Sequence, residues 1–157
     1  MMQHRFVAET ADRLRAEGIR CALETSSFAP EEIYRDVISR TDFVMADIKL
    51  MDPDDHLRYC GVPNGGILRN LRRLTDSGKD FLFRVPLIPG ITDTDRNLEA
   101  IAAFAGDAPV ELLPYNAMAG AKYASVGRRY GLPEAKKQTL SDLERMRSFF
   151  QNANTRK

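Results

Sequence analysis

Several features are scarce or missing in this sequence, and each absence narrows what the chain can be. No apolar run approaches the ~20 residues that a membrane helix needs, and the N-terminus has no apolar core of the kind found in a secretion signal. Low-complexity segments and short-period repeats are also absent. With 157 residues, of which 43% are hydrophobic, the composition predicts one soluble, cytoplasmic domain with a real core.

Cysteine and unbalanced charge are equally scarce. Cys21 and Cys60 belong to no C-x-x-C or C-x-x-x-C-x-x-C spacing, so the sequence shows no metal-cluster ligands of its own. The 23 basic and 22 acidic residues are interspersed, which argues against nucleic acid or a membrane surface as a partner. Small molecules or proteins with neutral surfaces are the expected partners.

The pattern of apolar residues alternates between helices and strands along the whole chain. Helices are expected over residues 4–16, from Pro30 onward, over 67–78 and 94–105, and within 132–157, and strands over 19–25, 43–50, 81–88 and 110–113. Mostly continuous apolar strands between helices predict an α/β fold with a parallel sheet covered by helices. Four strands are too few to close a barrel, and we expect another chain, such as a second copy, to cover the open edge at 19–25.

The strand Met45-Ala46-Asp47-Ile48-Lys49 carries an acid and a base on one face near its C-terminal end. Because strand side chains alternate, Met45, Asp47 and Lys49 point one way and their neighbours the other. Burying charges costs several kcal/mol each unless they have partners. This strand is therefore interpreted as part of a binding site, although a structural ion pair of Asp47 and Lys49 is the simpler alternative.

The other expected strands also end in polar residues. Glu24-Thr25-Ser26 ends the first strand, Arg84 lies in the third, and Pro114-Tyr115-Asn116 follows the fourth. Since ligands of parallel α/β sheets gather at the C-terminal strand ends, these groups are expected to converge. Each has an ordinary alternative, because Glu24 is equally typical of a helix cap or surface group and Arg84 of a counter-ion for an internal carboxylate.

Three further polar residues are less informative. His56 follows the aspartates at 52, 54 and 55 and is expected in an exposed loop. Tyr123 and Tyr130 lie in the expected loop 114–131, where they either pack on the sheet or cover a ligand. The sequence does not decide between these two.

Several of these segments together resemble a known family. Glu24-Thr25-Ser26, Asp47-Ile48-Lys49, GVPNGGILRNL at 61–71, RVPLIPGITD at 84–93 and ELLPYNAMAGAKYASVG at 111–127 are similar, in this order, to segments of glycyl radical enzyme activating enzymes of the pyruvate formate-lyase activating enzyme type. These are radical S-adenosylmethionine (SAM) enzymes. The resemblance covers nearly the whole chain.

The resemblance implies part of a (β/α)6 TIM-type barrel in which a 4Fe-4S cluster cleaves SAM. The 5′-deoxyadenosyl radical so formed removes a hydrogen from a glycine of a partner glycyl radical enzyme, with a flavodoxin or ferredoxin as reductant. The matching motifs imply that the cofactor would be contacted by Glu24, Asp47, Lys49 and Asn116. They also imply that Arg84 would lie near the partner peptide. Glu24, Thr25, Met45 and Asp47 match the positions of a monovalent-cation site, for which carboxylate and carbonyl oxygens are suitable ligands.

The departures from the family are as informative as the matches. The family's cysteine cluster loop and Gly-Gly-Glu-Pro segment would precede residue 1, so this chain alone is expected to bind no cluster and to make no radical. Ser27 stands where the family usually has a glycine, which bears on the backbone shape of that loop.

Two other functions remain open at this point. Asp47-x-Lys49-x-x-Asp52 also resembles the D-x-K-x-x-D motif of orotidine-phosphate decarboxylase-like barrels, in which a lysine between two carboxylates protonates a carbanion. The chain lacks the Gly-rich phosphate loops of those enzymes. The third reading is a non-catalytic binding module that has kept the fold.

Overall fold

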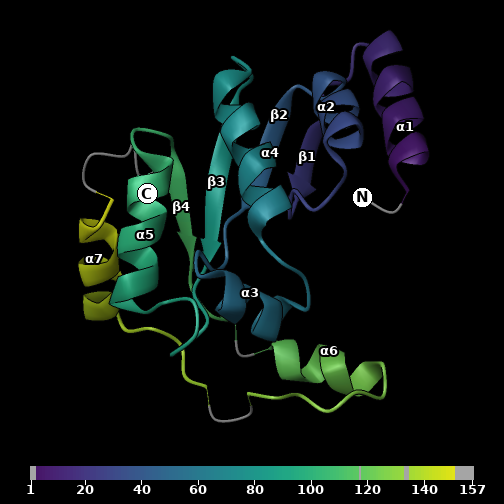
Figure 1. The fold of residues 1–157 in the computed structure, drawn as a ribbon. Helices are drawn as coiled ribbons and strands as arrows, with labels where there is room; N and C mark the ends of the chain where they lie inside the picture. Colours follow the sequence, from purple (N-terminus) through teal and green to yellow (C-terminus); the bar gives the residue numbers. More distant parts are fainter. Residues whose placement is uncertain (1–2, 117, 133–134, 151–157) are drawn as a thin grey trace.

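A computed structural model describes residues 3–116, 118–132 and 135–150 of the chain (Figure 1). Four parallel strands form one sheet in the order β1-β2-β3-β4, with β1 Ala22–Thr25, β2 Phe43–Asp47, β3 Phe81–Pro86 and β4 Val110–Leu113. The helices are α1 His4–Ala16, α2 Glu31–Ser39, α3 Pro53–Cys60, α4 Gly65–Asp76, α5 Asp95–Ala105, α6 Ala119–Ser125 and α7 Leu140–Ser148. The predicted α/β class with a parallel sheet is confirmed.

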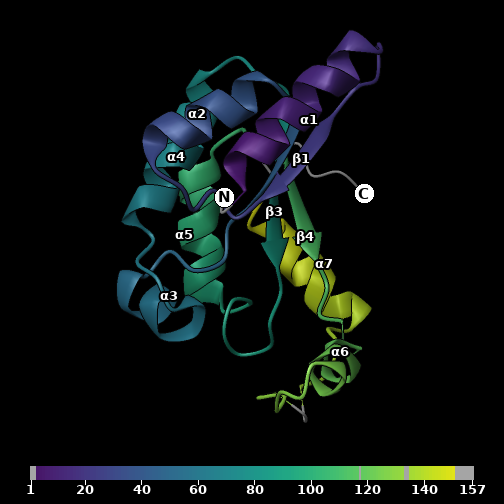
Figure 2. The same cartoon turned by 90° about the vertical axis from the view of Figure 1, so that its right-hand side faces the viewer.

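The core lies between the sheet and its helices. Helices α2, α4 and α5 lie on one side of the sheet, and α7 lies next to β4 (Figure 2). An ion pair between Arg145 and Asp95 joins α7 to α5. Val44 and Ala46 of β2 and Phe83 and Val85 of β3 are fully buried against these helices. The alternation of side chains then places Met45, Asp47 and Arg84 on the opposite face of the sheet. One face of the sheet therefore builds the core, and the other carries the polar residues.

The strands are shorter than their apolar patterns suggested. The expected strand 19–25 begins only at Ala22, and those over 43–50 and 81–88 end at Asp47 and Pro86. Apolar residues continue past these ends because the following loops are buried too: Ile48, Leu50 and Leu87 are at most 4% exposed. A run of apolar residues indicates that the chain is buried, and the buried segment extends beyond the residues that are hydrogen-bonded in the sheet.

Helices α3 and α6 fall in segments that were expected to be loops. In α3, the Asp52 carboxylate accepts hydrogen bonds from the amides of Asp54 and Asp55, Pro53 occupies the first turn, and Gly61 ends the helix at φ +77°. These are ordinary start and stop signals, but the run of aspartates resembles a loop. The expected helix within 132–157 is the shorter α7, which begins at a capping box of Thr139 and Asp142; residues 133–134 and 151–157 lie outside the described part.

The two edge strands of the described sheet are β1 and β4. That another chain covers the β1 edge stays a prediction. In the described ranges, no helix combines the length and the apolar character that crossing a membrane requires.

Candidate functional site

The parallel arrangement brings the polar C-terminal ends of all four strands to one end of the sheet (Figure 1). In the strand ladders, Asp47 of β2 pairs with Arg84 of β3, and Glu24 of β1 pairs with Met45 of β2. Parallel neighbours in register point their side chains to the same face. The structure therefore places Glu24, Asp47 and Arg84 side by side across three strands.

Arg84 is the centre of an ion-pair network. Its two terminal nitrogens lie 2.9 and 3.1 Å from the two carboxylate oxygens of Glu24, and Nη2 lies 3.2 Å from Asp47 Oδ1. The other oxygen of Asp47 accepts a hydrogen bond from Lys49 Nζ at 2.9 Å. Two carboxylates and two cations thus form a chain in which Asp47 is shared.

Partial burial strengthens this network. The side chains of Arg84 and Asp47 are 15% and 21% exposed, whereas that of Glu24 is 60% exposed. Hydrogen bonds to Glu24, and then the charge of Asp47, raise the pKa of Arg84 above its ordinary value. Arg84 is therefore a permanent cation, and Asp47 is the more desolvated of its two partners.

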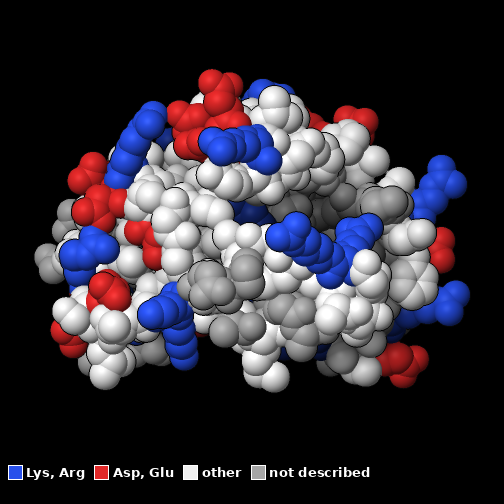
Figure 3. All heavy atoms as spheres, turned by 90° about the horizontal axis from the view of Figure 1, so that it is seen from below, with Lys and Arg blue, Asp and Glu red and all other residues white. Residues whose placement is uncertain are grey.

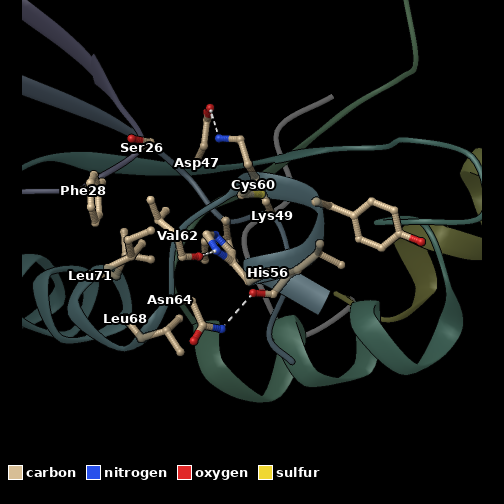
Figure 4. A pocket seen from close by; sticks show the side chains of 14 residues that line it. Ser26, Phe28, Asp47, Lys49, His56, Cys60, Val62, Asn64, Leu68 and Leu71 are labelled. Carbon is tan, nitrogen blue, oxygen red and sulfur yellow. Dashed lines mark hydrogen bonds and ion pairs between the residues drawn. The ribbon is translucent and has the colours of Figure 1, made fainter. Parts of the chain in front are cut away.

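Lys49 lies between two cavities at this end of the sheet. The first has a volume of about 420 Å³ and lies between the end of β2, α3 and α4 (Figure 4). Apolar side chains of α4, including Ile67 and Leu71, form much of its wall, and Asp47, Lys49 and His56 bring polar groups to it. A mostly apolar cavity with a few converging polar groups is typical of small-molecule sites.

His56 lies inside the protein, so the expectation that it is exposed was wrong. It is 4% exposed, and its Nδ1 lies 2.7 Å from the carbonyl oxygen of Val62, to which it donates (Figure 4). Placement on α3 rather than in a loop causes this burial. Cys60, one turn later, also lines the cavity; burial raises the pKa of its thiol, and the nearby Lys49 ammonium partly offsets that effect.

The second cavity, of about 760 Å³, lies at the ends of β3 and β4 and shares Lys49 and Cys60 with the first. Asn116, Tyr123 and Tyr130 line it. Viewed along the strands toward their C-terminal ends, Lys and Arg side chains lie around a hollow (Figure 3). Asn116 and Lys49 thus share one cavity, and the two tyrosines line it rather than only packing on the sheet.

The four residues predicted for a cation site do not converge through their side chains. Met45 Sδ lies 4.0 Å from Arg84 Nη1, beside the Glu24–Arg84–Asp47 network. Thr25 pairs with Ala46, on the core-facing side of the sheet, and its hydroxyl accepts a hydrogen bond from the amide of Ser27. Among the described residues, no group of three or more His, Cys, Asp or Glu side chains is arranged to hold a metal ion.

Buried carboxamides hold the loops that carry the polar residues, and the sequence reasoning missed them. Asn97 of α5 donates to the carbonyl oxygens of Lys49 and Thr92, both at 2.8 Å, and accepts from the amide of Met51 at 3.0 Å. Asn64 donates to the carbonyls of Leu50 and Met51. The loop directly after Asp47 is therefore clamped from two sides.

Similar clamps hold the other strand ends. Asn70 donates to the carbonyls of Ser27 and Ala29 in the β1 loop, and Gln138 joins the loops after β3 and β4 through Leu87 and Tyr115. The sequence did contain a signal for two of these carboxamides, because Asn70 and Asn97 occupy positions on the apolar faces of their helices. A polar residue at a core position indicates a buried hydrogen-bonding group.

Ser27 has the backbone conformation that a glycine would favour. Its φ is +58°, and it is the one non-glycine residue with positive φ among the described residues. It is fully buried, and its hydroxyl lies 3.2 Å from the Tyr34 hydroxyl. The loop thus keeps a left-handed turn at the position of the family's glycine, at some conformational cost.

Asp52 does not join Lys49, which speaks against the decarboxylase-like reading. Its carboxylate caps α3 and pairs with Arg96 at 3.0 Å. The lysine between two carboxylates that this chemistry requires is therefore not formed by Asp47, Lys49 and Asp52.

Comparison with known proteins gives a consistent relationship. No protein-family model matches the chain. It is 33% identical over 142 residues to the (2S)-3-sulfopropanediol dehydratase activating enzyme of Klebsiella oxytoca, covering 87% of the chain and 45% of that protein. It is 30% identical over 154 residues to the trans-4-hydroxy-L-proline dehydratase activating enzyme of Clostridioides difficile, covering 95% of the chain and 51% of that protein. The chain thus spans about half the length of these curated relatives.

Solved structures show the same fold. A domain of pyruvate-formate lyase-activating enzyme from Bacteroides vulgatus superimposes with a TM-score of 0.79 at 22% identity, covering 99% of this chain and 92% of that one. A radical SAM methyltransferase from Sphaerobacter thermophilus superimposes with a TM-score of 0.62 at 16% identity, covering 89% of this chain and 42% of that one. The fold therefore resembles part of the radical SAM domain.

Proposed function

We propose that this chain, which is homologous to glycyl radical enzyme activating enzymes, forms the C-terminal half of the SAM-binding wall of such an activase. The observation that carries the proposal is the position of Lys49, which pairs with Asp47 and lines both cavities at the strand ends. An ammonium held beside a carboxylate suits the carboxylate and ammonium of an amino acid such as the methionyl part of SAM.

The remaining predicted residues are assigned to the same wall. Asn116 lines the larger cavity with Lys49, where a carboxamide can bond a ribose or a base. We assign Glu24 and Asp47 to the surroundings of the cofactor and Arg84, which pairs with both acids, to the neighbourhood of the partner peptide. SAM supplies the radical chemistry once reduced by an iron-sulfur cluster. The residues of this chain bind and orient it.

In the whole activase, we propose that the substrate is a glycine of a glycyl radical enzyme and that the reductant is a flavodoxin or ferredoxin. The sequence contains two cysteines that are far apart, whereas cluster ligation of this type uses closely spaced thiolates. We therefore expect this chain by itself to bind no cluster. Iron and sulfide analysis after anaerobic reconstitution checks this, and a stoichiometric four-iron centre would contradict it.

Calorimetric titration of the isolated chain tests the binding role. We expect weak binding of SAM, because the chain spans about half the length of its curated relatives, and weaker binding of S-adenosylhomocysteine, which lacks the sulfonium charge. Lys49→Met should abolish the heat signal, while Lys136→Met, which removes an exposed lysine outside both cavities, should leave it unchanged. If the wild-type chain binds neither ligand at millimolar concentration, the binding-module reading without SAM is favoured instead.

A further inference from the structure

The smaller of the two cavities, of about 420 Å³, opens beside the hydrophobic core. Ile48, Ile67 and Leu71 in its wall belong to the core cluster. At its edge, the Asp47 carboxylate and the Lys49 ammonium are joined to each other at 2.9 Å (Figure 4). The cavity is therefore mostly apolar, and the ion pair beside it carries no net charge.

His56 brings a hydrogen-bond acceptor to this cavity. Its side chain is 4% exposed, and Nδ1 lies 2.7 Å from the carbonyl oxygen of Val62. Because a carbonyl oxygen only accepts hydrogen bonds, Nδ1 carries the hydrogen, and Nε2 of the neutral ring presents a lone pair. Within the described residues Nε2 has no hydrogen-bond partner, and no fully buried side-chain nitrogen or oxygen among them lacks one. Nε2 is therefore not sealed in the core, and since His56 lines the cavity, it is reached through the cavity.

Asn64 is the other buried polar side chain of the wall. Its Nδ2 donates to the carbonyl oxygens of Leu50 and Met51, so its N–H groups are used by the loop after β2. The two buried polar side chains thus leave acceptors to the cavity. A ligand that brings a hydrogen-bond donor satisfies Nε2, whereas a purely apolar ligand leaves it unpaired at a cost.

We propose that this cavity binds a small uncharged molecule with a compact apolar body and one hydroxyl group, such as a phenol, and that the hydroxyl donates its hydrogen to His56 Nε2. The apolar body lies against the core residues of the wall. A charged ligand is disfavoured, because the two charged groups at the edge already neutralise each other. His56 is the residue that selects for the hydroxyl.

This site lies next to the loop that carries Lys49. Ile48 and Leu50, the neighbours of Lys49 in the chain, both line the cavity, so a molecule bound there contacts that loop. The site is nevertheless separate from the proposed function, since it takes neither SAM nor an iron-sulfur cluster. Its test uses neither, and the result is therefore independent of whether the chain binds SAM.

The two cysteines supply a reporter and an internal control. Cys60 lines the cavity, whereas Cys21 lines neither of the two cavities. Iodoacetamide alkylation at about pH 8, where histidine is ordinarily neutral, is followed for each thiol by peptide mass spectrometry. At a phenol concentration of about ten times the dissociation constant, Cys60 should react about tenfold more slowly, and Cys21 should react at an unchanged rate.

A matched ligand tests the hydrogen bond to His56. Fluorobenzene has nearly the shape of phenol but no hydrogen to donate, and it is the more hydrophobic of the two. In a site without an acceptor, the buried phenol hydroxyl would make phenol bind about fivefold or more weakly than fluorobenzene. We expect wild type to bind phenol at least as tightly as fluorobenzene. His56→Phe, which removes the acceptor, should prefer fluorobenzene by about fivefold or more.

Two tryptophan variants locate the ligand, because Cys60 also lines the larger cavity. Leu68 lines the smaller of the two cavities and Ile91 the larger. Leu68→Trp should abolish the protection of Cys60 by phenol, and Ile91→Trp should leave it unchanged. The comparison of the two ligands in wild type decides the matter even where a variant fails to fold. Tighter binding of fluorobenzene than of phenol in wild type, no protection of Cys60, or protection lost in Ile91→Trp rather than in Leu68→Trp would each overturn the proposal.

Discussion

Replacing Asn97 by alanine is expected to destabilise the chain by about 3 kcal/mol, taking about 1 kcal/mol for each lost hydrogen bond. The side chain makes three such bonds, to the carbonyls of Lys49 and Thr92 and from the amide of Met51, at 2.8, 2.8 and 3.0 Å. It is 6% exposed, so water replaces these partners only in part. The two Asn64 bonds still hold the backbone of the loop after Asp47 from the other side, and the amide of Ile48 still donates to the Arg84 carbonyl.

Urea unfolding gives the free energy, and thermal unfolding gives a second estimate. For a chain of this size, 1 kcal/mol corresponds to about 2–4 °C, so the midpoint should fall by about 6–12 °C. Glu99→Ala, at an exposed position of the same helix, should change stability by less than about 0.5 kcal/mol. In Asn97→Ala, hydrogen exchange of the Met51 amide should accelerate by more than the loss of global stability accounts for. A destabilisation below about 1 kcal/mol, with Met51 still protected, would refute the role of Asn97 as a clamp.

Two other predictions follow from single residues near the site. Ser27→Ala keeps the strained φ of +58° and loses the hydroxyl beside Tyr34, so we expect its free energy of unfolding to fall by about 1–2 kcal/mol. Ser27→Gly, which adopts this φ without strain, should be more stable than Ser27→Ala by about 1 kcal/mol. Urea unfolding of both variants measures the difference, and equal stabilities would contradict the backbone argument. Hydrogen bonds from the amides of Asp55 and Asp54 and the charge of Arg96 lower the pKa of Asp52 below its ordinary 3.8, so its stabilising contribution is present above about pH 4 and is lost as the pH falls through the lower folded value. Asp52→Asn, which does not titrate, should lose less stability than wild type below pH 4 in unfolding experiments, and parallel acid profiles would show that this cap is not linked to pH.

Much of the fold was predictable because it depends on short-range patterns. The helices at 4–16 and 94–105 and the strand at 110–113 follow from apolar spacing and terminal residues, and they agree with α1, α5 and β4 to within one residue. The order of alternating helices and strands implies parallel strands, which in turn brings the polar strand ends to one edge. Each of these steps uses residues that are close together in the chain.

The misses share a physical cause. His56 was expected in an exposed loop, yet α3 turns it inward so that it donates to Val62. Asn64, Asn97 and Gln138 hold backbone groups 13 to 51 positions away in the chain. No local pattern reports such partners, because they depend on how a helix docks against the ends of the sheet.

By itself, the sequence determined the class of fold, the family relationship and the acids and bases that end the strands. Only the tertiary structure decided that Arg84 contacts Glu24 and Asp47 together, that Lys49 separates two cavities, and that buried amides hold the loop carrying it. Backbone preference and apolar periodicity act over a few residues, whereas charge pairing and cavity shape arise from strand register and helix packing between distant segments. For that reason the residue types of the site could be predicted from the sequence, but the contacts between them could not.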